Sequence, residues 1–166
     1  LRFTSGGRLL YTGVGETSDR MIQMENSMIL DHSGTGELIF SSAFNVLGNT
    51  KTLTLQGSTS GIGEIAGVIS AGSATTSLAK DGSGTWRLSA NNTFAGSTTV
   101  RNGTLILAGL NGAAASSSGY TVNHGATLRL DNAAGANNGN RLKDAGGVTL
   151  NGGTRHFAND GAAASY

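Results

Sequence analysis

The sequence predicts an all-β protein, a right-handed parallel β-helix (solenoid) of about seven coils. The first observation behind this prediction is a long-range repeat, in which five residues recur 48 positions later as residues of similar type. They are Leu30, Gly34, Gly36, Leu38 and Phe40, which recur as Leu78, Gly82, Gly84, Trp86 and Leu88. Repeats with periods of roughly 20 to 50 residues are typical of solenoids, in which each unit buries its apolar face against the next.

The second observation is a series of short segments in which apolar and polar residues alternate, a pattern that favours strands with one buried face. In chain order the predicted strands are residues 8–12, 27–30, 37–40, 52–56, 67–70, 85–89, 97–100, 104–107, 120–122, 127–130, 147–150 and 154–157. Four Asn-Gly pairs separate some of them and indicate sharp turns: Asn102-Gly103, Asn111-Gly112, Asn138-Gly139 and Asn151-Gly152.

Stacking these strands in register predicts files of inward-facing side chains. The predicted inward residues are Leu38, Phe40, Leu53, Leu55, Trp86, Leu88, Leu105, Leu107, Leu128, Leu130 and Leu150. The stretches 113–119 and 131–140 are small, polar and rich in turn residues, and are predicted to be loops that leave the rod. A β-sandwich is the alternative fold, because Asn-Gly between strands is typical of antiparallel hairpins.

Composition supports a single β-helical segment over residues 1–166. The chain has 27 glycines and no proline, which fits sharp corners between strands that are nearly all central in a sheet. The formal net charge is +1 and the basic residues are scattered, so no nucleic-acid partner is indicated. No cysteine is present, which excludes disulfides and thiolate metal sites. The first residue is Leu1, and we interpret the chain as a piece of a longer polypeptide.

Residues 78–109 carry a specific motif, G-x-G-T-W-x-L-S followed by N-T-F-x-G-x-T-x-V-x-x-G-T-L-x-L. The residues that form it are Gly82, Gly84, Thr85, Trp86, Leu88, Ser89, Asn92, Thr93, Phe94, Gly96, Thr98, Val100, Gly103, Thr104, Leu105 and Leu107. This stretch resembles the autotransporter-associated β-strand repeat, also called the passenger-associated transport repeat.

The resemblance implies a parallel β-helix in the secreted passenger of an autotransporter-like protein on the surface of a Gram-negative-type bacterium. It also implies a structural or adhesive stalk with no catalytic residues, no cofactor and no metal. The open strand edges at the two ends of a rod suggest as partners further repeats of the same polypeptide or end-to-end copies. Surface glycans or other cell-surface proteins are further expected partners, and no membrane span is expected in this segment.

A carbohydrate-active β-helix is the second hypothesis, and it would need acidic and exposed aromatic residues together on one face. Asp31 and Asp81 fall in corresponding turns, near His32 and Lys80, but not at matched positions, and solvated turn residues are the favoured interpretation. Tyr11, Tyr120 and Phe94 are the candidate exposed sugar platforms.

Metal and nucleotide sites receive little support. His124 and His156 lie far from other ligand types and are interpreted as surface turn residues. Calcium could use the oxygens of Asp131, Asn132, Asn137 and Asn138, but the repeat typical of calcium-binding β-rolls is absent. The glycine-rich stretch 61–67 is followed by a strand-like segment and not by a helix, so a dinucleotide site is not expected.

Overall fold

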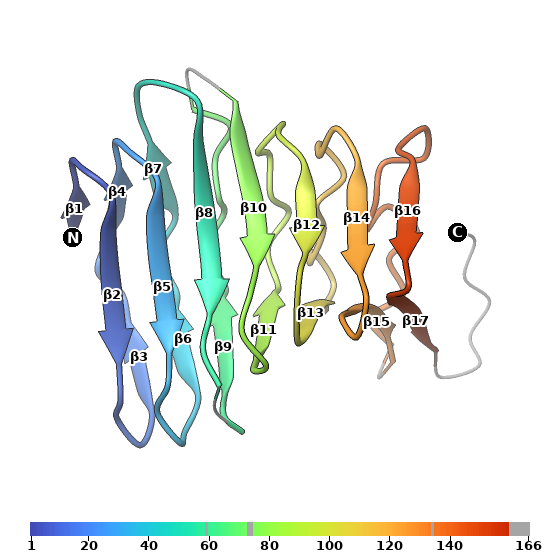
Figure 1. Ribbon diagram of the computed structural model, residues 1–166, viewed down its shortest axis with the longest axis horizontal. Coiled ribbons are helices and arrows are strands. Elements are labelled where there is room, and N and C mark those ends of the chain that lie inside the picture. The colour runs from blue at the N-terminus through green and yellow to red at the C-terminus, as the bar shows by residue number, and fades with distance from the viewer. Residues whose placement is uncertain (59, 73–74, 134, 160–166) are drawn as a thin grey trace.

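Parallel strands stack coil upon coil along one axis of the protein (Figure 1). The computed structural model describes residues 1–58, 60–72, 75–133 and 135–159. Every strand ladder in these ranges is parallel, and no helix occurs among the described residues. The predicted parallel β-helix is therefore confirmed, whereas the alternative β-sandwich would need antiparallel pairs.

Three sheets form the faces of the rod, two of them with seven strands and one with three. We call them the front, back and short sheets. The front sheet contains β2 (Gly7–Tyr11), β5 (Met28–His32), β8 (Lys51–Gln56), β10 (Thr76–Lys80), β12 (Thr98–Val100), β14 (Tyr120–Asn123) and β16 (Val148–Asn151). The back sheet contains β3 (Glu16–Ser18), β6 (Leu38–Phe40), β9 (Ile62–Ile65), β11 (Thr85–Leu88), β13 (Thr104–Leu107), β15 (Thr127–Asn132) and β17 (Thr154–Asn159). The short sheet contains β1 (Arg2–Phe3), β4 (Ile22–Met24) and β7 (Phe44–Val46).

One coil takes between 19 and 28 residues in these two sheets. Trp86 pairs with Leu105, 19 residues later, and Tyr120 pairs with Val148, 28 residues later. In Figure 1 the front strands run downward and the back strands run upward while the chain advances from the blue end to the red end, which is the path of a right-handed coil. The two seven-stranded sheets give the predicted seven coils.

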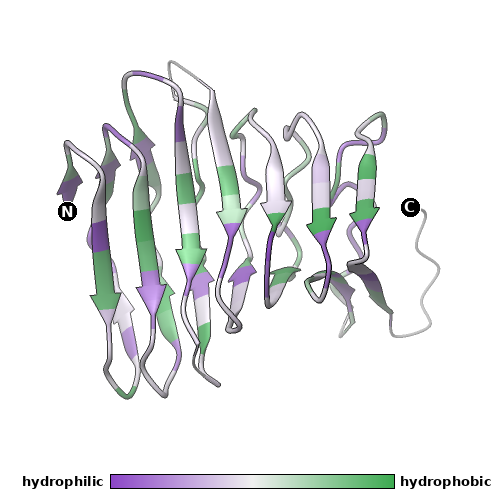
Figure 2. Ribbon diagram, in the orientation of Figure 1, coloured by the Kyte–Doolittle hydropathy of each residue, from purple (hydrophilic) through white to green (hydrophobic). Residues whose placement is uncertain are grey.

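The core is a set of side-chain files that run along the rod, one residue from each coil. One file in the back sheet contains Phe40, Ile65, Leu88, Leu107 and Leu130, all buried. Figure 2 shows the corresponding alternation of apolar and polar positions along the strands. All the predicted inward residues are buried except Leu150, whose side chain is 50% exposed although it pairs in register with the buried Val122.

The sequence pattern missed several strands. Residues 67–70 form no strand and contribute one isolated bridge, from Ile69 to Phe44, while the neighbouring β9 was not predicted. β9 is hidden in the sequence because Gly63 stands at one of its inward positions and breaks the apolar alternation. The other strands that the pattern missed are β1, β3, β4, β7 and β10.

The loop predicted for residues 113–119 is wrong. Ala113, Ala114 and Ser117 are buried, because Ala113 bridges Asn91 and continues the stack. This stack lies on the face of the rod that begins with the short sheet, which we call the third face. The segment is rich in small residues because it packs closely and not because it leaves the rod. Among the described residues, no helix has the length and apolarity needed to cross a membrane.

Candidate functional site

Trp86 is the largest fully buried side chain, and it lies against a glycine of the preceding coil. Its partner across the β9–β11 ladder is Gly63. A β-carbon on Gly63 would lie 2.6 Å from Cδ2 of Trp86, which is closer than two carbon atoms can approach. The indole Nε1 donates a hydrogen bond of 2.9 Å to the backbone oxygen of Gln56. The missing side chain at Gly63 therefore makes the space that the indole fills.

His32 continues this aromatic packing toward the first coil. Its ring centroid lies 6.4 Å from that of Trp86 and 5.6 Å from that of Tyr11. Burial lowers the pKa of His32, against smaller opposing contributions from the Gly36 backbone and the charge of Asp31. His32 is thus a buried side chain that packs between Tyr11 and Trp86.

Lys80 is fully buried at an inward position between Leu55 and Val100. Its ammonium group donates to the backbone oxygens of Asp81 (2.6 Å), Gly82 (2.8 Å) and Asn102 (3.1 Å). Three carbonyls that face inward at two successive turns are satisfied by the three N–H donors of one cation. Lys80 therefore joins two coils at a corner where backbone oxygens would otherwise be buried without partners.

Asn92 has the same role on the third face. The strands of this face end at β7, and the described residues of the later coils form isolated bridges there. Its side-chain nitrogen donates to the backbone oxygens of Ala90 and Ala113, both at 2.9 Å, and its oxygen accepts from the Ile69 amide at 2.9 Å. The next residue, Thr93, accepts from the amide of Ala71 at 3.0 Å. One buried amide side chain therefore connects three successive coils.

The two candidate carboxylates, Asp31 and Asp81, border the same surface depression of about 450 Å³. The front-sheet ladder pairs Asp31 with Gln56, and Asp81 follows Lys80, which pairs with Leu55. The backbones of Asp31 and Asp81 therefore lie two coils apart, about 9.6 Å, with Gln56 between them.

The surroundings of Asp31 do not suit a general acid. Its side chain is only 4% exposed and accepts hydrogen bonds from Arg8 (2.6 Å), Ser33 (2.6 Å) and Gln56 (2.5 Å). Burial acts to raise the pKa of Asp31, but these hydrogen bonds and the charge of Arg8 outweigh it, and the pKa lies below its ordinary value. A carboxyl held in its ionised form cannot donate the proton that glycoside cleavage requires.

The oxygen-rich segment that begins at Asp131 already contains a cation of the protein, Arg141. The buried guanidinium donates to the side-chain oxygen of Asn132 at 2.5 Å, and to the backbone oxygens of Gly112 at 2.6 Å and Ala136 at 2.9 Å. Asp131 forms an ion pair with Arg129 at 2.8 Å. Sequence reasoning missed Arg141, because a lone arginine in a polar stretch gives no sign of burial.

The remaining sequence candidates do not form a site. His124 and His156 are both exposed, on different coils. No group of three or more histidine and acidic side chains is close enough to hold a metal ion within the described residues. Two of the proposed sugar platforms are wrong, because Tyr120 is 2% exposed and Phe94 is fully buried, while Tyr11 packs partly against the core.

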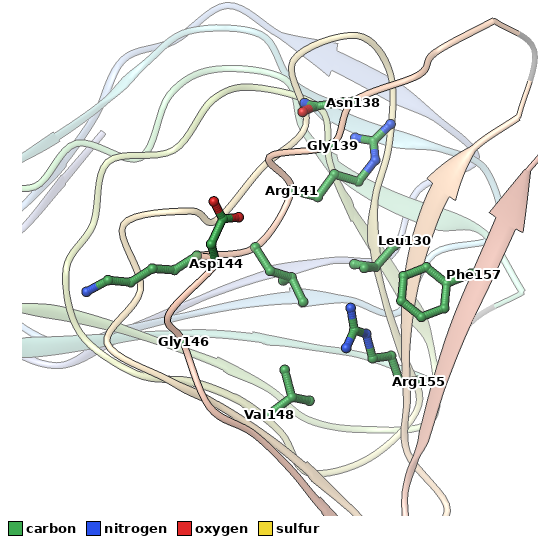
Figure 3. A pocket seen from close by; sticks show the side chains of 11 residues that line it. Leu130, Asn138, Gly139, Arg141, Asp144, Gly146, Val148, Arg155 and Phe157 are labelled. Carbon is green, nitrogen blue, oxygen red and sulfur yellow. The ribbon is translucent and has the colours of Figure 1, made fainter. Parts of the chain in front are cut away.

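A hollow of about 390 Å³ opens at the C-terminal end of the rod (Figure 3). It lies between β17, which contributes Arg155 and Phe157, and the segment 138–148. The floor is Leu130 of the preceding coil. The hollow thus reaches a member of one of the buried side-chain files.

Comparison with known proteins agrees with this geometry. Residues 78–107 match the family model described as passenger-associated-transport-repeat. The chain is also similar to a protein of Brucella suis biovar 1 (strain 1330) named Adhesin BmaC autotransporter, with 38% identity over 103 residues. That alignment covers 58% of this chain and 3% of the relative. No solved structure gives a significant match.

The chain therefore carries an autotransporter passenger repeat built into a β-solenoid, as the sequence motif indicates. The matched residues include Lys80, Trp86 and Asn92, which connect successive coils at the front-sheet corner, in the back sheet and on the third face. The matched segment thus contains three buried side chains that hold one coil on the next.

The packing of Trp86 over Gly63 predicts a coupled effect of two substitutions. We expect Gly63→Ala to lower the free energy of unfolding by about 1–3 kcal/mol, because the new methyl group overlaps the indole. In a Trp86→Ala background the same change should cost less than about 1 kcal/mol, because the two residues are in contact and their effects are not additive. Urea denaturation of the four proteins measures the coupling.

Gly147→Ala is the matched control, since nothing lies within 4 Å of a β-carbon at Gly147. Its effect should stay within about 0.5 kcal/mol. Equal costs of Gly63→Ala with and without Trp86 would contradict the packing described above.

Lys80 predicts a pH dependence of stability. Burial lowers its pKa from 10.5 to about 8. Between these values the unfolded chain binds more protons at this site than the folded chain, so the contribution of Lys80 to the free energy of unfolding rises with pH. We therefore expect Lys80→Met to be more destabilising at pH 10 than at pH 7, as measured by urea denaturation at both values. The exposed Lys143→Met is the control, and a Lys80→Met effect that is equal at both pH values would refute this expectation.

Proposed function

We propose that this chain is a segment of an extracellular β-helical stalk in the passenger of an autotransporter-like bacterial surface protein. In this proposal the segment supplies stiffness and spacing, and contributes to adhesion by presenting neighbouring parts of the polypeptide. It has no catalytic activity of its own. The observation that carries the proposal is that the matched repeat residues are used to join coils, with Lys80, Trp86 and Asn92 all buried.

The mechanism of such a stalk is mechanical. Each inner strand of the two long sheets shares a hydrogen-bonded ladder with the coil before and after it, and the buried files fill the interior. The stability of such a solenoid is close to a sum of the stabilities of its coils and of the contacts between neighbouring coils. Further coils can therefore be added without altering the existing ones. The similarity to the named adhesin supports a place at the bacterial surface.

The partners that we propose are further coils of the same polypeptide or end-to-end copies of the rod, together with surface glycans or other cell-surface proteins met by its flanks. The parallel ladders that join successive coils in both long sheets support the first of these partners. Nucleic acid is not among the proposed partners, because the net charge is only +1.

One experiment separates the stalk from a carbohydrate-active protein. The purified chain and its Asp31→Asn/Asp81→Asn variant are each incubated with a panel of polysaccharides, and product release is measured by mass spectrometry. We expect no product from either protein, since the pKa of Asp31 is held low and the carboxyl stays ionised. Product formed by the natural chain and lost in the variant would contradict the proposal.

Surface location is tested in the same study with the parent polypeptide in its own bacterium. Trypsin added to intact cells should release peptides of this segment, with a cytoplasmic protein as the negative control. Release only after cell lysis would count against a surface stalk.

A further inference from the structure

The turn between β12 and β13, away from both ends of the rod, contains the pair Asn102-Gly103 (Figure 1). The backbone amide of Gly103 donates a hydrogen bond of 2.8 Å to Oδ1 of Asn102, the side chain of the residue before it. Because a carbonyl carbon lies about 1.23 Å from its oxygen, the Gly103 nitrogen is within about 4 Å of the Asn102 side-chain carbon. The side chain of Asn102 is therefore folded over the nitrogen of the next peptide bond.

The surroundings keep this nitrogen open to approach. Gly103 has a φ of +63°, and a β-carbon there would lie 2.4 Å from the backbone oxygen of Gly84, so a larger residue does not fit. No side chain of residue 103 therefore hinders the side chain of Asn102. Asn102 itself is exposed, so water reaches its side-chain amide.

The buried ammonium group of Lys80 contacts the same peptide group, since it donates to the backbone oxygen of Asn102 at 3.1 Å. That oxygen and the Gly103 nitrogen belong to one peptide bond, over which the electrons are delocalised. When the nitrogen loses its proton, negative charge spreads to the oxygen, where the cation stabilises it. Lys80 therefore makes the Gly103 nitrogen easier to deprotonate, and deprotonation makes it a nucleophile.

The three other Asn-Gly pairs, all within the part of the chain that the structure describes, lack this arrangement. Oδ1 of Asn138 accepts from the amide of Asn140 at 2.9 Å, and its side-chain nitrogen donates to the backbone oxygen of Leu110 at 3.1 Å. The side chains of Asn111 and Asn151 make no hydrogen bond to the amide of the glycine that follows them. These pairs are internal controls for the chemistry of Asn102.

We propose that Asn102-Gly103 is a site of spontaneous succinimide formation and deamidation, promoted by Lys80. The Gly103 nitrogen gives up its proton and attacks the side-chain carbon of Asn102. The new carbon–nitrogen bond closes a five-membered ring, the bond to the side-chain nitrogen breaks, and this nitrogen leaves with the proton as ammonia. Water then opens the ring at either carbonyl and leaves aspartate or isoaspartate at position 102. In sum, the amide and one water molecule give a carboxylate and an ammonium ion.

The related pair Asp81-Gly82 lies in the preceding coil and contacts the same cation. The amide of Gly82 donates to Oδ1 of Asp81 at 2.9 Å, and Lys80 donates to the backbone oxygen of Asp81 at 2.6 Å. A carboxylate has no amine to release, and its negative charge resists attack by a nucleophile. Of the two peptide groups that Lys80 contacts, the one that follows Asn102 is therefore the reactive one.

Either product changes the corner where Lys80 joins two coils. Both products place a new negative charge at position 102. Isoaspartate also adds one carbon to the main chain and shifts the carbonyl oxygen that accepts from Lys80. The modification therefore acts on the contact between coils, and it is an addition to the stalk function that does not depend on it.

The test follows all four Asn-Gly pairs of the purified chain during incubation at neutral pH in heavy-oxygen water, with peptide mapping by mass spectrometry. The isotope separates conversion during incubation from earlier conversion. We expect Asn102 to convert about tenfold faster than Asn111, Asn138 and Asn151 in the folded chain. In urea, where the folded geometry is lost, the four rates should agree within about threefold.

Two substitutions test the part of Lys80. Lys80→Gln keeps N–H donors but removes the positive charge, and Lys80→Met removes both. Each should lower the rate at Asn102 about tenfold. Loss of a purely structural contact would instead loosen the turn and raise the rate. Lys143→Gln, at an exposed lysine, is the matched control and should leave the rate unchanged.

Circular dichroism shows whether each variant folds. If the Lys80 variants do not fold, the folded and urea-unfolded forms of the natural chain still decide. An Asn102 rate no higher than the other three, or higher only in urea, would overturn the proposal. A rate that is unchanged or raised in folded Lys80→Gln would overturn the part assigned to Lys80. Neither result affects the polysaccharide and cell-surface experiments.

Discussion

In-register stacking of one coil on the next is the constraint on which the rest of the structure depends. Because the strands are parallel and paired residue by residue, each inward side chain must fit the one from the preceding coil. Trp86 shows how strict this requirement is, since its indole occupies the space that Gly63 leaves empty. The size of a residue is therefore fixed by its neighbours along the file, and a large residue at one coil requires a small one nearby.

Corners and the third face impose a second requirement, because there the backbone has no continuous ladder to satisfy its polar groups. Lys80, Asn92 and Arg141 supply the missing donors from buried positions. Each connects segments from different coils. Such groups are costly to bury unless every donor finds an acceptor, so they fix the alignment of the coils as well as stabilise it. This explains why a repeat whose role is structural carries polar residues at specific places.

The sequence predicted the coils well and the buried polar residues poorly. Leu38 and Trp86 revealed the repeat because inward positions must recur once per coil. Strand β9 escaped notice because its inward glycine has no apolar side chain to count. Lys80 and Arg141 are charged, and nothing in the sequence marks them as buried. The backbone oxygens that surround them come together only when the chain folds. The prediction of an exposed Tyr120 is wrong, because burial of an aromatic ring depends on the coils on both sides of it.

Distances between coils test the central claim of regular parallel stacking most directly. The chain has no cysteine, so spin labels can be attached at Cys substitutions of Thr17 combined in turn with Ile106, Arg129 and His156. These positions share one outward file of the back sheet. Pulsed electron resonance should give distances that increase by about 4.8 Å from each pair to the next. Distances that do not increase in this order would contradict a rod of stacked parallel coils.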